Sequence, residues 1–406
     1  MKIIYLHQYF RTPDMAGGTR SYEMARRLAG AGHDVHMVTT RTDDSGSRFP
    51  RWISEEIDGI HVHSLTLAYN NRMSIRRRLV SFAAFALLSA GKTVRLSGDV
   101  VLASSTPLTI AIPAISARLL QRVPVVFEVR DLWPEIPIAM GALRSPLLIW
   151  IARVLERAAY KQSSRIVALS QGMADGIVAC GVDPDKVIVI PNSCDIELFG
   201  VDDSRGQNFR ARRNWLADNP LVVYCGTLGK VNGVSYMVEL ASEFKTINPL
   251  VRFLVIGDGA ETEMIKRLAV ERCVLDRSFF IEAPISKKEM PDALNAATVC
   301  TSFVIPVAEL EANSANKFFD ALAASRPIVI NHGGWQASLI KEHGLGAVLN
   351  AHDFGVAARE LDSLLSDPAA LSHAAKGAEA LAVERFSRSR LAGQLRDVLE
   401  VTYRCS

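Results

Sequence analysis

Short apolar runs alternate with longer amphipathic runs along nearly the whole chain. In the first half, the runs typical of strands are Ile3–Leu6, Val35–Thr39, Ile60–Leu65, Val100–Ala103, Val123–Phe127, Ile166–Leu169 and Val187–Ile190. Between them lie stretches with helical periodicity, at Thr19–Ala31, Ile75–Ser89, Leu108–Leu120, Pro146–Gln162 and Gln171–Ala179. This rhythm predicts a parallel β-sheet covered by helices.

The rhythm is interrupted once and then restarts. Between about Gly200 and Asn219 the chain is polar and contains Gly and Pro, which indicates a linker. The later strand-like runs are Leu221–Cys225, Val251–Ile256, Ser278–Ile281, Val299–Thr301, Pro327–Ile330 and Ala347–Leu349, and the tail from about Asp367 is helix-like. The pattern therefore predicts an α/β protein with two doubly wound domains and a cleft between them.

Composition narrows the class of protein. A chain of 406 residues suits two or three domains, and 49% hydrophobic with 22% charged residues argues against disorder. The net charge of +3 gives no argument for nucleic-acid binding. The six cysteines form no C-x-x-C pair and predict core residues in a reducing compartment. The N-terminus predicts a first strand rather than a signal peptide, and no apolar stretch reaches the roughly 18 residues of a membrane span.

Three loops that follow predicted strands carry glycines. One contains Gly17 and Gly18, one contains Gly226 and Gly229, and one reads "IGDGAETE". Glycines let backbone amides approach a ligand, and helix N-termini attract phosphate, although each loop alone could be a simple tight turn. None completes G-x-G-x-x-G, and G-x-x-x-x-G-K-[ST] is absent, which argues against dinucleotide oxidoreductases and P-loop enzymes.

Lys317 stands in the predicted first turn of a helix, where the helix dipole disfavours a cation. If Asn313 or Ser314 caps this helix, Asp320 lies one turn beyond Lys317 on the same face. Helix amides together with an ammonium form a phosphate site, and Asp320 could then accept hydrogen bonds from ribose hydroxyls. The alternative is a solvated surface pair between Lys317 and Asp320.

The chain resembles the retaining enzymes of glycosyltransferase family 4. The segments that carry the resemblance are "GGTRSYEMARRLAGAGHDVHMVTT" at 17–40, "FEVRDLWPE" at 127–135, "VIVIPNSCDIELF" at 187–199, "YCGTLGKVNGV" at 224–234, "FLVIGDGAE" at 253–261 and "NSANKFFDALAASRPIVI" at 313–330. The combination of "RDLWPE", "NSANKFFDALAA" and "NHGGWQ" is similar to bacterial O-antigen and capsule enzymes, in particular WbuB-like N-acetyl-L-fucosamine transferases.

The resemblance implies a GT-B fold, in which two Rossmann-like domains face a central cleft. It implies an acceptor-binding domain at 1–200, a nucleotide-sugar-binding domain at 201–385, and a C-terminal helix at 386–406 that packs on the first domain. Lys317 would hold the donor diphosphate, Asp320 the ribose, and backbone groups near Ala283 and Pro284 the base. The donor contacts that it implies are Gly17, Gly18, Gly226, Gly229, Lys230, Ala283, Pro284, Ser314, Asn316, Lys317 and Asp320.

The sequence departs from the family at the Glu-x7-Glu motif. Asp320 stands at its second position, but the first is Ala312. Glu309 and Glu311 are therefore the candidates for the donor sugar. At 192–194 the chain has Asn-Ser-Cys where the family often has Asn-Gly-Val. The "DPD" at 183–185 lies in a predicted turn, and the resemblance implies neither metal nor cofactor.

The segment "EVRDLWPE" crowds four charges behind a predicted strand. Arg130 and Asp131 are the candidates for acceptor positioning or charge stabilisation. The alternative is a local ion-pair cluster in which Glu128 and Glu135 brace the loop.

A basic and apolar segment predicts contact with a membrane surface. No acidic residue lies between Asp58 and Asp99, and Leu79 to Ala90 is nearly all apolar. An apolar stretch beside basic residues can lie at an anionic bilayer surface; the alternative is a core helix with a solvated basic start. The basic residues are Arg72, Arg76, Arg77, Arg78, Lys92 and Arg95.

The resemblance, taken with these features, implies a retaining transferase in O-antigen or capsule biosynthesis. It would move an acetamido-deoxy sugar, with N-acetyl-L-fucosamine as the example that the resemblance suggests, from a UDP donor to a polyprenyl-diphosphate-linked glycan. We expect it in the cytoplasm, on the inner face of the cell membrane, without nucleic acid. The alternatives are a nucleotide-sugar epimerase of the same shape and a non-catalytic nucleotide-sugar-binding partner.

Overall fold

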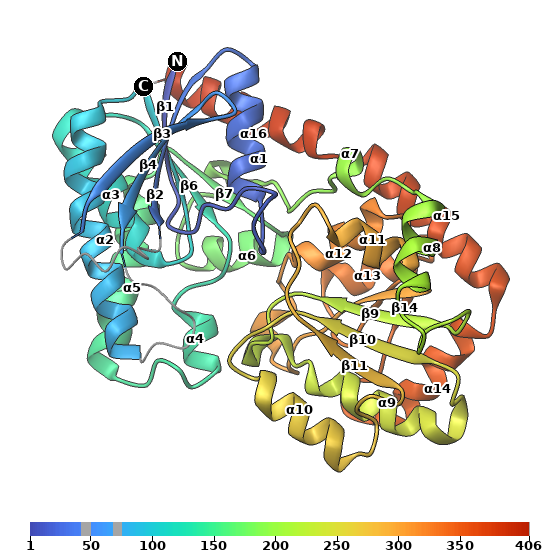
Figure 1. The fold of residues 1–406 in the computed structure, drawn as a ribbon. Helices are drawn as coiled ribbons and strands as arrows, with labels where there is room; N and C mark the ends of the chain where they lie inside the picture. The colour runs from blue at the N-terminus through green and yellow to red at the C-terminus, as the bar shows by residue number, and fades with distance from the viewer. Residues whose placement is uncertain (42–49, 68–74, 406) are drawn as a thin grey trace. The chain divides into compact units, whose positions relative to one another are not determined.

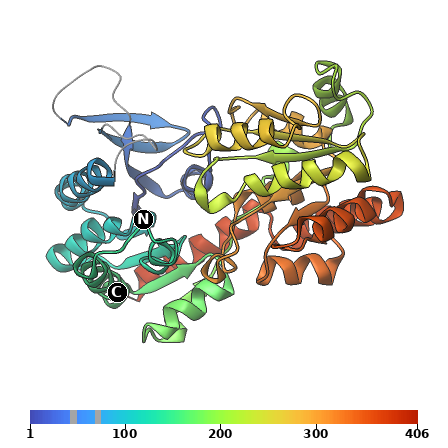
Figure 2. The same cartoon turned by 90° about the horizontal axis from the view of Figure 1, so that it is seen from below.

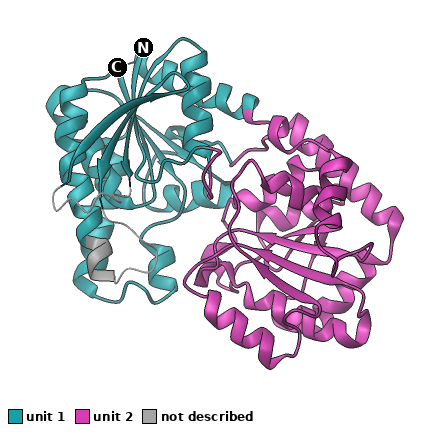
Figure 3. Cartoon of the chain, viewed as in Figure 1, with its two compact units in different colours: residues 1–12, 19–191, 389–406 teal, residues 13–18, 192–388 magenta. Residues whose placement is uncertain are grey.

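The computed structural model describes residues 1–41, 50–67 and 75–405, without the side chains of 75–79. Two compact units divide the chain (Figure 3). Unit 1 comprises 1–12, 19–191 and 389–406, and unit 2 comprises 13–18 and 192–388. No helix among the described residues has both the length and the apolar character needed to cross a bilayer.

Unit 1 is built on an eight-stranded sheet (Figure 1). Its strands are β1 (Lys2–Leu6), β2 (Asp34–Arg41), β3 (Trp52–Ile57), β4 (Ile60–Thr66), β5 (Val100–Ser104), β6 (Val125–Val129), β7 (Arg165–Ala168) and β8 (Val187–Val189). Its α-helices are α1 (Arg20–Gly30), α2 (Ile75–Leu96), α3 (Ala111–Gln121), α4 (Glu135–Ala139), α5 (Pro146–Gln162), α6 (Gln171–Ala179) and, except for its first residue, α16 (Arg388–Arg404).

The strand order of this sheet is β3-β4-β2-β1-β5-β6-β7-β8. Every pairing is parallel except that of β3 with β4, which is antiparallel. The central strand β1 is almost wholly buried, because helices cover both faces of the sheet (Figures 1 and 2). The sequence did not predict β3, an edge strand whose Ser54, Glu55 and Glu56 are exposed and break the apolar alternation.

Unit 2 contains a six-stranded parallel sheet in the order β11-β10-β9-β12-β13-β14. The strands are β9 (Leu221–Cys225), β10 (Arg252–Ile256), β11 (Phe279–Glu282), β12 (Val299–Ser302), β13 (Ile328–Ile330) and β14 (Gly346–Val348). The helices are α7 (Ile196–Phe199), α8 (Asp203–Ala211), α9 (Ser235–Ile247), α10 (Thr262–Glu271), α11 (Met290–Ala296), α12 (Asn316–Ala323), α13 (Trp335–His343), α14 (Phe354–Leu365) and α15 (Pro368–Glu384).

The prediction of a linker between about Gly200 and Asn219 is wrong, because this segment contains α8. At Gly206 the helix approaches the chain so closely that a Cβ atom would lie 2.6 Å from the carbonyl oxygen of Asn295. Phe209 is buried, and the guanidinium of Arg210 donates hydrogen bonds of 3.0 and 2.7 Å to the carbonyl of Ala296. The polar residues that suggested a linker thus anchor a short helix.

Strand order places one switch point in each sheet. In unit 1, successive connections run to opposite sides of β1, so the carboxyl ends of β1 and β5 flank a crevice. In unit 2 the corresponding strands are β9 and β12. Open α/β sheets bind their ligands at these points. The loops after these four strands are therefore where the architecture favours a site.

A buried carboxyl on α5 makes the stability of unit 1 depend on pH. Burial raises the pKa of Glu156 to about 7, although the hydroxyl of Tyr160 donates to it at 3.1 Å. The folded protein therefore favours protonated Glu156, so its contribution is complete below the ordinary pKa of 4.5 and is lost as pH rises through 7. We expect Glu156→Gln to remove this loss, with a slope of at most about 1.4 kcal/mol per pH unit, in denaturant titrations at pH 5 and pH 8. If the difference in unfolding free energy between the parent and Glu156→Gln is the same at pH 5 and pH 8, this assignment is wrong.

Candidate active site

The loop after β9 lies against the first turn of α12 in unit 2. A Cβ atom on Gly226 would lie 3.2 Å from Cε of Lys317. The next loop is equally close, because a Cβ atom on Gly257 would lie 1.9 Å from the carbonyl oxygen of Gly226. Only glycine allows this packing. It brings the backbone of the loops after β9 and β10 close to the Lys317 side chain.

Lys317 is held in position by neutral neighbours. Its ammonium donates to Oδ1 of Asn232 at 3.0 Å and lies 5.2 Å from the ring centre of Tyr224. Burial lowers the pKa of Lys317 to about 8, an effect that Asp320 and Cys225 oppose. The lysine therefore carries a positive charge that its direct contacts leave uncompensated. Asn232 was not predicted, although it lies in the glycine-marked loop.

The first turn of α12 has no side-chain cap, so the predicted cap at Asn313 or Ser314 is wrong. The residue at the cap position is Ala315, whose own amide donates to Oδ1 of Asn313 at 3.1 Å. The hydroxyl of Ser314 instead accepts from the amide of Asn192 at 3.2 Å. The first turn of α12 thus has no side-chain cap, although the amide of Phe318 donates to the carbonyl of Ala315 at 3.1 Å. A helix start without a side-chain cap is the arrangement of an anion site.

Asp320 does not form the surface pair with Lys317 that the sequence left open. It is buried, and its Oδ2 lies 2.5 Å from the ammonium of Lys287, which is buried as well. The ring centre of Phe199 lies 4.6 Å from the same ammonium. Lys287 was not predicted, because it lies 33 residues before its partner. The second oxygen of Asp320 is the one that could meet a ribose hydroxyl.

The other donor candidates lie in loops of unit 2. Lys230 is exposed in a 3-10 turn, and Asn316 is the first residue of α12. Ala283 and Pro284 are exposed directly after β11. Gly229 is the residue before the 3-10 turn of Lys230.

Glu309 and Glu311 are both exposed beside the short 3-10 turn that follows β12. Glu311 packs on the loop after β13, since a Cβ atom on Gly333 would lie 2.9 Å from its Oε1. This loop is in turn tied down by the indole of Trp335, which donates to the carbonyl of Asn313 at 2.7 Å. Glu311 is therefore the more fixed of the two candidates for the donor sugar.

Gly17 and Gly18 belong by their contacts to unit 2, although the sequence placed them in the first domain. The carbonyls of Pro13 and Met15 accept hydrogen bonds of 3.3 Å from the amides of Lys288 and Lys287. The loop after β1 thus contacts the segment that holds the partner of Asp320.

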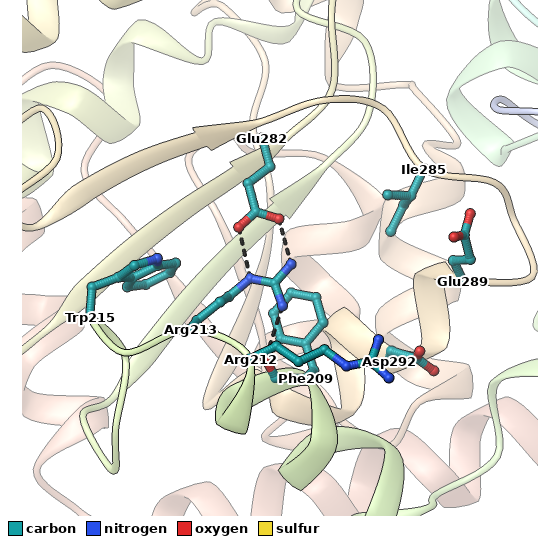
Figure 4. Close-up of a pocket in the computed structure, with 8 residues that line it drawn as sticks. All are labelled: Phe209, Arg212, Arg213, Trp215, Glu282, Ile285, Glu289 and Asp292. Atoms are coloured by element: carbon teal, nitrogen blue, oxygen red, sulfur yellow. Dashed lines mark hydrogen bonds and ion pairs between the residues drawn. The ribbon is translucent and has the colours of Figure 1, made fainter.

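A pocket of about 420 Å³ lies beside the end of β11 (Figure 4). Its lining consists of Phe209, Arg212, Arg213, Trp215, Glu282, Ile285, Glu289 and Asp292. The guanidinium of Arg213 makes two hydrogen bonds to Glu282, at 2.7 and 2.6 Å, and Trp215 stacks on Phe280 with ring centres 3.7 Å apart. None of the predicted donor residues lines it, and its charged pair fastens the segment after α8 to the edge strand β11.

In unit 1, Arg130 is oriented by a histidine. Its Nη1 donates to Nε2 of His7 at 3.0 Å, so Nδ1 of His7 carries the hydrogen and donates to Ser21 at 2.8 Å. Burial and then the charge of Arg130 lower the pKa of His7 to about 3, which keeps the imidazole neutral. The backbone amide of Arg130 also donates to the hydroxyl of Ser105 at 3.0 Å. The carboxyl ends of β1, β5 and β6 thus converge on this arginine.

The alternative of a local ion-pair cluster in "EVRDLWPE" is wrong. Glu128 is fully buried and binds Arg20 of α1 through Nε at 3.0 Å and Nη2 at 2.8 Å. Burial raises the pKa of Glu128, but Arg20 and Arg130 outweigh this effect and the net pKa is lowered. Asp131 accepts from the hydroxyl of Thr106 at 2.8 Å, and burial raises its pKa. Arg130 and Asp131 are therefore not tied up by Glu128.

Gln8 is a further residue that the sequence did not single out. It lies two residues after β1 and is fully buried, and neither its Oε1 nor its Nε2 has a hydrogen-bond partner among the described residues. Buried side-chain amides are nearly always hydrogen-bonded. The unpaired amide of Gln8 therefore marks the switch point of unit 1 as a place where a ligand could bind. The signal that could have found it is its place at the carboxyl end of a central strand.

Comparison with known proteins matches this architecture. The family model described as "Glycosyl transferase 4-like domain" matches residues 16–193, and the model described as "Glycosyl transferases group 1" matches residues 207–380. The "Probable glycosyltransferase WbjE" of Pseudomonas aeruginosa is 24% identical over 341 residues, which are 82% of this chain and 79% of that protein. The chain is a GT-B glycosyltransferase.

Two solved structures show the same fold as the enzyme. Sucrose-phosphate synthase from Thermosynechococcus elongatus aligns over 100% of both chains, with a TM-score of 0.80 and 17% identity. Anabaena Alr3699/HepE in complex with UDP-glucose aligns over 99% of this chain and 100% of that chain, with a TM-score of 0.70 and 18% identity. A relative by sequence is the "Putative colanic acid biosynthesis glycosyl transferase WcaI" of Escherichia coli K12. It is 22% identical over 290 residues, which are 66% of this chain and 69% of that protein.

Proposed function

We propose that the enzyme transfers an acetamido-deoxy sugar, with retention of configuration, from a UDP donor to a lipid-linked glycan of a bacterial surface polysaccharide. The observation that carries this proposal is Lys317 beside the uncapped first turn of α12. A diphosphate supplies the anion that this cation and these amides lack. The relatives named for polysaccharide biosynthesis and the complexes of HepE with UDP and UDP-glucose support the choice of donor and pathway.

In this proposal, unit 2 binds the leaving group and unit 1 binds the acceptor. Lys317 and the α12 amides stabilise the negative charge that develops on the diphosphate as the glycosidic bond breaks. The departing phosphate oxygen can take the proton of the acceptor hydroxyl, so no separate base is required. Arg130, held by His7, and Asp131 position the acceptor.

The lipid-facing surface that we propose lies on α5 rather than mainly on α2. Helix α2 buries Phe85 and Ala86 in the core, although Val80 and Leu87 are exposed. The side chains of Arg72, Arg76, Arg77 and Arg78 lie outside the described residues, and Lys92 contacts the ring of Trp52 at 5.5 Å.

The first half of α5 instead exposes five large apolar side chains, which we call the α5 face. Its exposed residues are Leu147, Leu148, Trp150, Ile151 and Val154, with exposed fractions between 41% and 64%. Arg153 and Arg157 are exposed on the same helix. Large apolar side chains with an interfacial Trp and basic neighbours are typical of helices that lie in an anionic bilayer surface.

The double variant Trp150→Ser and Ile151→Ser is expected to reduce binding to vesicles of anionic phospholipid at least tenfold. Each buried large apolar side chain contributes about 1.5–3 kcal/mol, which a serine does not supply. Sedimentation with vesicles measures this, with Leu250→Ser, an exposed apolar residue of unit 2, as the matched control. If the double variant sediments like the parent, the α5 face does not carry the lipid contact.

Release of UDP decides between the proposed function and its alternatives. Purified enzyme is given a panel of UDP-acetamido sugars, with and without lipid extract as acceptor. A transferase releases UDP faster with the acceptor, and the anomeric configuration of the product shows retention. An epimerase converts the donor sugar without any acceptor, and a non-catalytic partner binds UDP but releases none from the donor.

A further inference from the structure

Three histidines and an aspartate share one face of the sheet in unit 1. Asp34 is the first residue of β2, and His36 follows two residues later on the same side of the strand. His36 is the register partner of His61 on β4, and His63 lies two residues beyond His61. Side chains paired in this way point to the same face, so the four converge.

The distances in this cluster suit a metal ion. Oδ1 of Asp34 lies 3.1 Å from Nε2 of His36 and 3.5 Å from Nε2 of His61. The possible ligand atoms of the three residues all lie within 4.8 Å of one another. Tetrahedral zinc with bonds of about 2.0–2.2 Å separates its ligand atoms by roughly 3.3–3.6 Å. Small side-chain shifts would therefore place all three around one ion.

A hydrogen-bond chain fixes the orientation of the central ring. Nδ1 of His36 lies 3.0 Å from Nε2 of His63, and Nδ1 of His63 lies 2.8 Å from the hydroxyl of Ser54. If a metal takes Nε2 of His36, its Nδ1–H donates to His63, which in turn donates to Ser54. Each imidazole stays neutral, and the hydroxyl only rotates. Metal-binding histidines almost always have a second-shell partner of this kind.

We propose that Asp34, His36 and His61 bind a divalent transition metal, with Zn²⁺ as the best fit and a water molecule in the fourth position. Two imidazoles and one carboxylate favour zinc, cobalt or nickel over magnesium or calcium. About half of the Asp34 and His61 side-chain surface is exposed, so an ion can enter from solvent. The site lies at the amino ends of its strands, whereas Arg130 follows a carboxyl end. Its role is to clamp β2 to β4, separate from sugar transfer.

Titration of the chelator-treated, untagged protein with Zn²⁺ tests the proposal. The parent is expected to bind one extra equivalent compared with His61→Ala, with at least tenfold higher affinity, and to unfold at a higher temperature with Zn²⁺. His352→Ala, which removes an exposed histidine of unit 2, is the matched control and should behave like the parent. Co²⁺ in the parent should give the intense visible bands of a tetrahedral complex, and Asp34→Asn should weaken them.

Two results would overturn the proposal. Equal Zn²⁺ binding by the parent and by His61→Ala would place the ion elsewhere. Absence of any Zn²⁺-dependent rise in the unfolding temperature of the parent, with His61→Ala folded, would leave the cluster as a hydrogen-bond network only. The proposed sugar transfer does not use Asp34, His36 or His61, so the result of the UDP-release assay is independent of this test.

Discussion

Lys317→Ala is expected to weaken UDP binding by about 1.5–3 kcal/mol, the range for a charge-assisted hydrogen bond, or about 10- to 150-fold. Among the described residues, the ammonium contacts Oδ1 of Asn232 and the ring of Tyr224, which are both neutral. In the proposed function, the donor diphosphate supplies the opposite charge. Isothermal calorimetry with UDP measures the loss. Because the pKa of Lys317 is about 8, the affinity of the parent should also decline above that pH, and that of the variant should not.

Lys341→Ala is the matched control, because it removes an exposed lysine from α13 of the same unit. Its UDP affinity should equal that of the parent. If Lys317→Ala is folded and binds UDP as tightly as this control, Lys317 has no phosphate role. The anion site at α12 would then have to be abandoned.

Breaking the buried pair of Lys287 and Asp320 is expected to cost about 3–5 kcal/mol of unfolding free energy, because either single change leaves one buried charge without its partner. The pair is nearly inaccessible to solvent, with side-chain exposures of 3% and 7%. Denaturant titration of Lys287→Met and Asp320→Asn measures the two losses. Their combination should lose clearly less than the sum, since it leaves neither charge in the interior.

The same variants test the ribose contact of Asp320. In the folded double variant, UDP affinity should fall while pyrophosphate affinity stays near that of Lys287→Met alone. Equal losses for UDP and pyrophosphate would remove the ribose role. Single variants as stable as the parent would instead show that the pair is not buried in solution.

The fold could be predicted because its signal is local. Parallel strands such as β9 are covered on both faces, so they appear as short apolar runs, and α5 and α6 begin and end where the periodicity predicts. Helix α8 was not predicted, although Asp202 caps its first turn, because its polar sequence hides the hydrogen bonds of Arg210 to the carbonyl of Ala296, 86 residues away. A polar sequence does not show which backbone carbonyls its arginine side chains will bind.

Residues of the candidate site could be predicted only where their position in a loop or a helix turn was itself unusual. Lys317 stood out because a cation is unusual in the first turn of a helix. Its neighbour Asn232 and the Lys287 partner of Asp320 could not be found, because those contacts span 85 and 33 residues. The same holds for Glu128, whose partner Arg20 lies 108 residues before it. Charge pairing over such separations is decided by tertiary structure.

The two ends of the segment 192–388 of unit 2 are joined by an isolated β-bridge between Cys194 and Ser387. The amide of Cys194 donates to the carbonyl of Phe386 at 2.8 Å, and the amide of Arg388 donates to the carbonyl of Cys194 at 3.0 Å. Residues 192–388 therefore start and finish side by side, as an inserted domain does. A stretch with adjoining ends can be expressed alone, circularly permuted, or exchanged for the matching stretch of a relative. In the proposed function unit 2 binds the donor, so chimeras joined at these two positions test whether donor preference moves with residues 192–388.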